Sequence, residues 1–404
     1  MKNLWFILIV AILIRLFLAL STFHPDIQSF NLSGKIVASG NILNLYDFLP
    51  SLPDGDPVKN LAVFNYPPSI YIFNGIFNFI FNIFGLPINQ FLLDSPSNYG
   101  NILFNLHILL LKLPYLLFDL AIVFVLLRLF ENRKNGKLAT ILWLFNPINL
   151  YATYMMGQFD VIPTFFTVIS IYFVSKNKLN LAALFLGGGI AFKLYPIFLL
   201  IPLIVLGKNS WERIKLIILT IVPYILTILP YLPSHDFRST ALFASQSSKS
   251  LYAAIPVSGG ESILLFPVFL IFFYLLIFIN KNITIWKNYL ISLLLFFIFT
   301  HYHPQWLIWL TPFLIMDLVL NNFKHIVAVG IIFTSFIGSL FFFDSSLTVN
   351  MFAPIAPNLY KLADIWTLMH VNMDYNLTRS ILQTIFISSA LFLMYEYTKK
   401  TDHI

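Results

Sequence analysis

The chain has 404 residues, of which 59% are hydrophobic and 10% are charged, and its mean hydropathy is +0.83. A soluble domain needs roughly a quarter of its residues charged to cover its surface, so this composition excludes a water-soluble globular protein. The chain has no cysteine, which excludes disulfides and thiolate metal sites, and its net charge is +7. Because the apolar runs reach about 20 residues, we expect membrane-spanning helices rather than barrel strands.

Apolar segments recur along the whole chain. Hydropathy predicts helices near residues 4–22, 104–130, 137–155, 161–175, 181–206, 214–232, 262–280, 288–303, 304–320, 325–343 and 380–396. The first segment follows Lys2 but lacks a small-x-small cleavage site, so we interpret it as a retained signal anchor. The sequence therefore predicts an all-α integral membrane protein, a single polytopic domain over residues 1–404, which we expect to be monomeric.

Segment 67–86 is apolar but contains Pro67, Pro68, three Asn and two Gly. If it crossed the membrane, the basic run at 131–137 would fall outside, against the usual cytoplasmic position of Lys and Arg. We therefore expect this segment to lie along the outer interface as an amphipathic or re-entrant piece.

Segment 181–206 has basic residues on both flanks, which both favour the cytoplasmic side. The sequences "GGG" at 187–189 and "KLYP" at 193–196 would let the segment break into two short helices that enter the membrane and return. With this break, the chain makes about 12 crossings, within a range of about 10 to 13, and both termini are cytoplasmic.

In this topology fifteen of the 24 Lys and Arg residues lie at the cytoplasmic face and six lie in or near outer loops. This bias explains the net positive charge without a nucleic-acid partner. Three long outer loops follow: 23–103, with short interfacial helices, then 233–261 and 344–379. We expect a plasma-membrane protein with its polar machinery on the extracytoplasmic side.

Polar residues that hydropathy does not explain fall at the outer ends of helices. They are Asp26, Gln158, Asp160, Lys193, His301, His303 and Gln305. A charge at mid-membrane depth costs about 3 kcal/mol and is by default a functional candidate. Together these residues predict a cavity open to the outer leaflet, with a carboxylate at its rim and cations deeper.

Simpler interpretations remain for several charges. Lys193 could form an ion pair with Asp160 or Asp119 that only holds helices together. We expect Arg15 to snorkel to the surface. We expect Lys112 to snorkel too, or to meet Asp119, two turns away on roughly the same face.

The two histidines of the turn "HYHPQW" also have two interpretations. His301 and His303 could belong to an interfacial aromatic belt with the tryptophans that follow. With Asp26 or Asp160 they could instead bind a divalent metal. Their i, i+2 spacing before a proline is not the spacing of a helical two-histidine site, so the metal signal is weak.

A transferase that takes a sugar from a lipid phosphate fits this cavity. The acceptor hydroxyl loses a proton as it attacks, which requires a carboxylate base, and the leaving phosphate gains charge that Lys or His stabilises. No P-loop or Gly-rich dinucleotide turn is present. A transporter or flippase of a lipid-linked sugar is the alternative, which an inverted repeat would favour. A polymerase or ligase using a lipid diphosphate would typically need more outer arginines.

Five stretches match a known family in the same order. They are "HPDIQSFNLSGKIVASGNILNLY" (24–46), "YPP" (66–68), "WLFNPINLYATYMMGQFDVIPTFF" (143–166), "AFKLYPIFLLIPL" (191–203) and "HPQWLIWLTPFLI" (303–315). The chain resembles the GT-C superfamily of polytopic glycosyltransferases, in particular family 87-type and GPI mannosyltransferase I-type enzymes. Each stretch alone is weak, but their order and spacing together are fairly specific.

The resemblance implies a GT-C type helix bundle and an inverting transfer of a hexose, typically mannose, from a polyprenyl-phosphate donor. The acceptor would be a lipid-linked glycan, a glycolipid or a protein. The implied catalytic base is Asp26, and the implied donor-site residues are Lys193, Tyr195, His301, His303 and Gln305. We expect His24, Gln28, Tyr66, Gln158, Asp160 and Trp306 to line the pocket.

One position departs from the family pattern. The GPI enzymes carry Asp-x-Asp where this chain has His24-Pro25-Asp26, so one carboxylate is replaced by an imidazole. A lipid monophosphate offers no diphosphate for a metal to bridge, so we expect that no cofactor is required. Mg²⁺ or Mn²⁺ held by His24 and Asp26 is the alternative.

Overall fold

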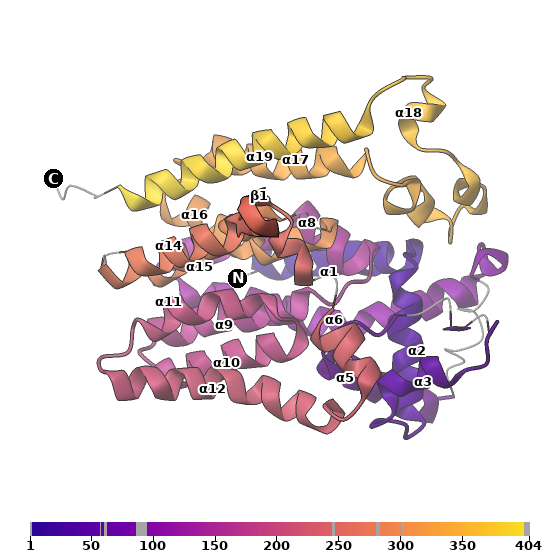
Figure 1. The fold of residues 1–404 in the computed structure, drawn as a ribbon. Coiled ribbons are helices and arrows are strands. Elements are labelled where there is room, and N and C mark those ends of the chain that lie inside the picture. Colours follow the sequence, from indigo (N-terminus) through magenta and orange to yellow (C-terminus); the bar gives the residue numbers. More distant parts are fainter. Residues whose placement is uncertain are drawn as a thin grey trace.

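The computed structural model describes residues 2–56, 58–59, 63–85, 95–244, 247–279, 283–300 and 303–399. They form a bundle of helices whose long axes run roughly together (Figure 1). Its helices are α1 (Lys2–Ser21), α6 (Ile102–Leu129), α7 (Arg133–Leu144), α9 (Val161–Ser175), α10 (Leu179–Phe192), α11 (Leu200–Ile204), α12 (Ser210–Ile228), α14 (Leu265–Ile279), α15 (Ile285–Phe299), α16 (Thr311–Leu320), α17 (Ile326–Leu340) and α19 (Tyr375–Thr398).

Shorter elements connect the bundle helices. They are α2 (Asp26–Ala38), α3 (Leu45–Ser51), α5 (Pro68–Ile83), α8 (Pro147–Asn149), α13 (His235–Phe237), α18 (Ile365–Leu368) and the antiparallel pair β1 (Ala254–Pro256) and β2 (Ser262–Leu264). Several single turns of 3-10 or π helix complete the connections, including Leu150–Met155, Tyr195–Leu199 and Pro304–Trp309.

Within the described residues, four stretches are long and apolar enough to cross a membrane: Leu4–Ser21, Ile102–Leu129, Ser210–Tyr231 and Tyr375–Thr398. Shorter apolar helices, such as α9, α10, α14, α15 and α17, pack among them. The prediction of an all-α, multi-pass membrane protein is therefore confirmed. The number of crossings stays a prediction.

The predicted span 137–155 is not one continuous helix, so this expectation was wrong. Helix α7 ends at Leu144, and the Asn146 side chain accepts hydrogen bonds from the backbone of Ile148 and Asn149. Such a side-chain cap starts a new helix and competes with continuation of the old one. A short α8 and the π turn Leu150–Met155 follow.

The predicted break within 181–206 is confirmed at "KLYP". The prediction that "GGG" at 187–189 helps to break the helix was wrong, because these glycines lie inside α10. Helix α10 ends at Phe192, and Lys193 is extended before the 3-10 turn Tyr195–Leu199. The chain then folds back against α10. Its return is shown by Pro196, whose ring would lie 3.3 Å from a Cβ at Gly189. Since α9 starts after Asp160 and α10 ends before Lys193, the Lys176–Lys178 turn between them lies at the opposite end of the bundle.

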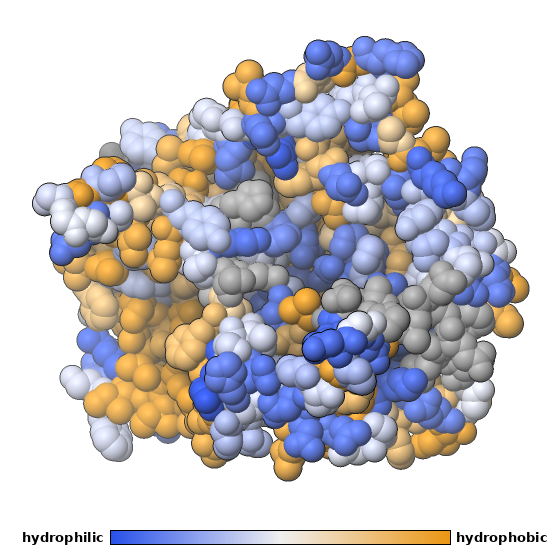
Figure 2. All heavy atoms as spheres, turned by 45° about the vertical axis from the view of Figure 1, so that its right-hand side comes forward, coloured by the Kyte–Doolittle hydropathy of each residue, from blue (hydrophilic) through white to orange (hydrophobic). Residues whose placement is uncertain are grey.

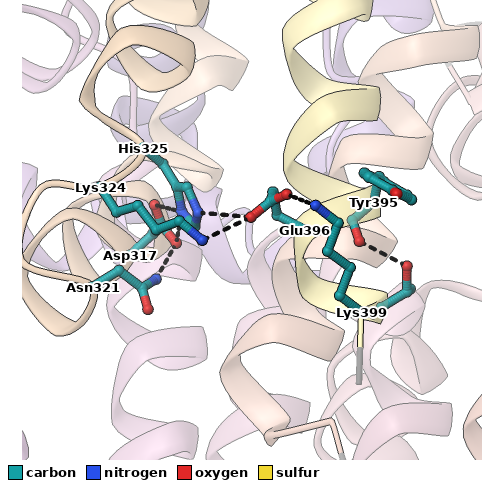
Figure 3. Close-up of polar contacts among 8 residues, drawn as sticks. Asp317, Asn321, Lys324, His325, Tyr395, Glu396 and Lys399 are labelled. Carbon is teal, nitrogen blue, oxygen red and sulfur yellow. Dashed lines mark hydrogen bonds and ion pairs between the residues drawn. The ribbon is translucent and has the colours of Figure 1, made fainter. Parts of the chain in front are cut away.

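Polar contacts fasten α19 to its neighbours at this opposite end (Figure 3). The Nδ1 atom of His325 lies 3.0 Å from both carboxylate oxygens of Asp317, and its Nε2 lies 3.7 Å from Glu396. Glu396 also accepts from Lys324 at 2.9 Å and pairs with Lys399. These contacts hold the end of α16 and the start of α17 against the last turns of α19.

A buried network corrects the expectation that Arg15 snorkels. Its side chain is fully buried, and Nε lies 2.6 Å from Asp119. The same carboxylate accepts hydrogen bonds from Trp143 at 2.6 Å, Asn149 at 2.9 Å and Tyr154 at 2.6 Å. The carboxylate thus accepts from four donors, and this hydrogen bonding offsets part of the cost of burying the Arg15–Asp119 pair.

Lys112 is also buried, and it neither snorkels nor meets Asp119, so both expectations were wrong. Its ammonium donates to the carbonyl oxygens of Ala19 at 3.2 Å, Thr22 at 2.5 Å and Met155 at 3.1 Å. The first two belong to the end of α1, whose last carbonyls have no intrahelical partner and carry partial negative charge. Lys112 therefore caps α1 just below the site described next.

The outer segment 23–103 packs by close helix contact. A Cβ at Gly34 of α2 would lie 2.3 Å from the Asn78 amide, and one at Gly75 of α5 would lie 2.3 Å from Val37. These glycines let α2 and α5 cross at close range. The segment predicted at 67–86 is thus a helix packed along α2.

The second end of the bundle, which we call the Asp26 end, carries α2, α3 and α18 (Figure 1). Loop 344–379 is tied to it, because Met351 accepts from the backbone of Phe23 at 2.8 Å and Leu347 accepts from the Tyr151 hydroxyl at 2.8 Å. Figure 2 turns this end forward and shows hydrophilic side chains gathered around a hollow.

Candidate active site

Three consecutive residues, Gln158, Phe159 and Asp160, form the centre of the site. They follow Gly157, whose φ of +70° lies in the left-handed region that favours glycine. A Cβ at Gly157 would lie 2.5 Å from the Ile27 side chain, so only glycine lets this turn approach α2 so closely. All three side chains are fully buried. This turn brings the start of α9 against the start of α2.

Asp26 is the first residue of α2 and receives a hydrogen bond from the Gln158 amide to its Oδ2 at 2.6 Å. Gln158 is fully buried, whereas 47% of the Asp26 side chain is exposed. The carboxylate is therefore fixed from one side and open to solvent on the other. This arrangement is required of a base that takes a proton from an incoming hydroxyl.

His24 lies beside this carboxylate. Its Nδ1 accepts the backbone N–H of Asp26 at 3.3 Å and lies 3.7 Å from Oδ2. Burial lowers the pKa of His24 more than Asp26 raises it, so the imidazole is neutral at ordinary pH. Within the described part of the chain, no third His, Asp or Glu joins the pair as a metal set.

Asp160 pairs with Lys193, as one of the simpler interpretations predicted. The Lys193 ammonium lies 2.7 Å from Oδ1 of Asp160, and the Trp309 indole donates to the same oxygen at 2.6 Å. The other oxygen, Oδ2, is buried and has no hydrogen-bond partner among the described residues. Asp160 thus joins three elements, α9, the end of α10 and the turn Pro304–Trp309.

Aromatic rings surround the Lys193 ammonium. It lies 5.1–5.6 Å from the centres of Tyr66, Phe159, Trp306 and Trp309. Cation–π contacts of this kind partly replace the lost hydration of a buried cation. The cage also touches α2, because Phe30, one turn after Asp26, packs against Phe159 at 5.4 Å. The helix that begins at Asp26 is therefore in direct contact with the aromatic cage around Lys193.

A cavity of about 300 Å³ opens on this cage. Tyr195 lies flat on Trp309, with ring centres 4.0 Å apart and planes at 5°, and Trp306 stacks on Trp309 at 5.2 Å. The lining comprises Asn65, Tyr66, Pro67, Lys193, Leu194, Tyr195, Ile197, Phe198, Ala241, Ala244, Ser250, Phe296, Trp306 and Trp309. The cavity is mostly apolar and aromatic, and Lys193, whose ammonium pairs with Asp160, is one of its lining residues.

The rim holds a cation that the sequence did not single out. The Lys249 ammonium lies 2.7 Å from Nε2 of His303, beside the cavity residue Ser250. Burial lowers the pKa of Lys249, and no carboxylate lies within ion-pair distance of it among the described residues. The one available signal was a lysine within a Ser- and Gln-rich stretch of an outer loop.

Of the remaining predicted residues, some line the cavity and others do not. Gln28 points to Ser95, with its amide 3.0 Å from that hydroxyl, and not to the cavity. Gln305 is buried, does not line the cavity, and its Oε1 finds no partner in the described structure. His301 lies outside the described residues. Tyr66, Tyr195 and Trp306 line the cavity, as expected.

Comparison with known proteins supports a family assignment for part of the chain. Residues 153–229 match the model of a family described as mannosyltransferase (PIG-M). The GPI mannosyltransferase 1 of Kluyveromyces lactis is 31% identical over 96 residues, which cover 23% of this chain and 23% of that protein. The aligned part thus spans less than a quarter of that relative.

The family match includes Gln158, Asp160, Lys193 and Tyr195, and it confirms the resemblance over 153–229. Asp26 and the turn after residue 303 lie outside the matched residues. Their place in the site therefore rests on the geometry described above.

Proposed function

We propose that this chain is a membrane glycosyltransferase that transfers mannose from a polyprenyl-phosphate donor to a lipid-linked glycan, glycolipid or protein. One observation carries the proposal. The Gln158–Asp160 segment holds a half-exposed carboxylate, Asp26, on one side and a caged cation, Lys193, on the other. The matched family and the relative described above both carry the word mannosyltransferase in their names.

In the proposed reaction, a hydroxyl oxygen of the acceptor forms a bond to the anomeric carbon of the donor. The bond from that carbon to the phosphate oxygen breaks, and the electron pair leaves with the lipid phosphate. Asp26 takes the hydroxyl proton, which a carboxylate with one exposed face can do. Attack from the side opposite the leaving group inverts the configuration at the anomeric carbon.

The leaving phosphate needs positive charge, and two cations are available. Lys193 is held by Asp160 at 2.7 Å, so the two charges largely cancel. Lys249 has no such carboxylate among the described residues, so we assign the donor phosphate to Lys249, with His303 beside it. A Lys249→Met variant should raise the KM for the donor, whereas Lys361→Met, at an exposed position, should not.

The aromatic lining suits the rest of the donor. The faces of Trp306 and Tyr66 offer flat apolar surface, against which the C–H faces of a hexose and the first prenyl unit can pack. The unpaired Oδ2 of Asp160 can accept a sugar hydroxyl, which would satisfy a buried acceptor.

The test is an assay of the purified chain with radiolabelled mannosyl-phosphoryl-polyprenol, glucosyl-phosphoryl-polyprenol or a nucleotide-activated mannose. We expect transfer only from the prenyl-phosphate mannose. Asp26→Asn should lower the rate by roughly 100- to 10,000-fold, the usual contribution of a general base. Asp54→Asn, at a fully exposed carboxylate of the same outer segment, is the control. A full rate in Asp26→Asn would refute the base assignment.

The same assay addresses the transporter alternative. If the chain moves a prenyl-phosphate sugar across reconstituted vesicles but never consumes it, the glycosyltransferase proposal fails. Consumption of the donor with release of prenyl phosphate supports it.

A further inference from the structure

A second cavity, which we call the α19 pocket, lies between α15, α17 and α19. Its volume is about 560 Å³. Pro304 lines this pocket, and Trp306 and Trp309 of the same turn line the active-site cavity. The turn Pro304–Trp309 therefore contributes to both cavities. The reaction proposed above does not use this second cavity.

The α19 pocket contains a cation without a carboxylate partner. Arg379, in the second turn of α19, lies with its guanidinium 4.7 Å from the centre of the Phe343 ring and donates to the Asn376 amide oxygen at 2.5 Å. Among the described residues, no Asp or Glu lies within ion-pair distance of it. A guanidinium held by an amide and a ring keeps several N–H donors for an oxyanion.

A second polar group in the wall of the α19 pocket is a buried hydroxyl. Thr300 is 3% exposed, and its hydroxyl has no hydrogen-bond partner among the described residues. An unsatisfied buried hydroxyl is unfavourable, so a ligand that supplies an acceptor oxygen there gains by satisfying it. Gln383 from α19 is anchored on the Phe297 carbonyl at 3.0 Å and completes this polar side.

The rest of the wall is apolar. Ile298, Phe299 and Phe336 line the α19 pocket from α15 and α17. On α19 itself, Ile381 and Ile385, just past Arg379, are 50% and 42% exposed, which is the pattern of a helix face in contact with lipid. A ligand for this pocket therefore combines an anionic headgroup with hydrocarbon.

We propose that the α19 pocket binds a membrane phospholipid with net negative charge, its phosphate on Arg379 and Thr300 and its chains against Phe299 and Phe336. Bidentate contact of a guanidinium with phosphate is a favoured geometry, and a buried hydroxyl adds a donor. A bound lipid would contact the turn Pro304–Trp309 at Pro304 and so help to hold Trp306 and Trp309. The proposal does not depend on the glycosyltransferase activity.

The test measures binding of dioctanoyl phosphatidylglycerol to the purified full-length chain in neutral detergent. We expect dioctanoylglycerol, which lacks the phosphate, to bind at least about tenfold more weakly, and zwitterionic dioctanoyl phosphatidylcholine to lie between them. Arg379→Gln should weaken binding of phosphatidylglycerol about tenfold, because it removes a charge-assisted contact. Lys361→Gln, an exposed cation of the neighbouring loop, should leave binding unchanged.

A second variant keeps the Arg379 charge but fills the volume of the α19 pocket. Ser380→Trp, at an exposed position of α19 that lines the pocket, should abolish binding with Arg379 intact. Size-exclusion profiles matching wild type establish that both variants fold. Unchanged binding in both folded variants overturns the proposal, as does equal binding of dioctanoylglycerol.

Two further measurements distinguish a phospholipid from free phosphate and from a polyprenyl phosphate as the ligand of this pocket. Millimolar inorganic phosphate should fail to displace the lipid, and displacement by phosphate alone would mean that the site is not a lipid site. A polyprenyl phosphate that binds much more tightly than phosphatidylglycerol would also overturn the proposal, because the pocket would then belong to the donor.

Discussion

The side-chain amide of Gln158 donates a 2.6 Å hydrogen bond to the carboxylate of Asp26, although 132 residues separate them in the chain. Gln158 is fully buried and Asp26 is half exposed. The bond therefore fixes one carboxylate oxygen from within the fold and leaves the opposite side to a substrate. The proposed chemistry depends on this relationship, and it can be perturbed without removing Asp26 itself.

Gln158→Glu places a second carboxylate against Asp26. Like charges at this distance raise the pKa of a carboxyl group, and the base acts only when deprotonated. We therefore expect the acidic limb of the pH–rate profile to move to higher pH. Gln158→Asn is the matched control, since the shorter asparagine side chain is neutral but does not reach the Asp26 carboxylate. It should lower the rate without moving that limb, and identical profiles for the two variants would contradict the role given to Gln158.

The Asp160–Lys193 pair can be tested by a double-mutant cycle. Removing one partner of a buried pair leaves an uncompensated charge, which costs about 3–5 kcal/mol. Asp160→Asn and Lys193→Met should each lower the free energy of unfolding, and the double variant should lose less than their sum. If the pair serves substrate binding as well, the stable double variant stays inactive. Recovery of full activity in it would mean that the pair is only structural.

Asp119→Asn tests the buried network around Arg15. The substitution leaves the guanidinium without its counter-ion, so we expect about 3–5 kcal/mol lower stability, seen as a lower thermal midpoint. Activity per folded molecule should not change, because the network lies away from the cavity lining. Asp54→Asn breaks an ion pair whose carboxylate is fully exposed and should leave the midpoint nearly unchanged. Equal effects of the two substitutions would argue against a buried Arg15.

His24 predicts a pH dependence of stability. Because burial holds its folded-state pKa below the ordinary value of 6.5, the unfolded chain takes up the proton first as the pH falls. The contribution of His24 is therefore present above about pH 6.5 and is lost progressively below it. Thermal midpoints of wild type should fall more steeply on acidification than those of His24→Gln. Parallel curves would contradict a buried, neutral imidazole.

Metal dependence is a further open prediction. We expect transfer to continue in excess EDTA, because a lipid monophosphate gives a metal no second phosphate to bridge and cationic side chains can serve the leaving group. The measurement compares initial rates with and without chelator. Loss of activity that Mn²⁺ or Mg²⁺ restores would favour a site at His24 and Asp26 and would refute this expectation.

Much of the fold could be predicted from the sequence because a membrane span is a local property. Runs such as 4–22 and 104–130 are apolar over the length a bilayer requires, and they are helices in the structure. The break at Lys193 could also be predicted, because both flanks of the segment are basic and a proline follows three residues later. The interruption at Asn146 was missed, because a side-chain cap within an apolar run leaves hydropathy almost unchanged.

Part of the candidate site could be predicted in the same way. Hydropathy and the Lys and Arg bias placed Asp26, Gln158, Asp160 and Lys193 at one level, and the structure brings them into contact in pairs. Their catalytic or binding roles stay predictions. Lys249 was missed because a lysine in a polar loop is ordinary until its neighbours are known.

The sequence by itself determined the class of protein, most of the helices and the end of the bundle at which Asp26, Gln158, Asp160 and Lys193 lie. These depend on the free energy of placing each side chain in lipid or water, which adds along the chain. Only the tertiary structure decided the partners, namely Gln158 for Asp26, Asp119 for Arg15 and His303 for Lys249. A buried charge gains its stability from a partner that folding brings near, often more than a hundred residues away, and spacing along the chain carries no record of that choice.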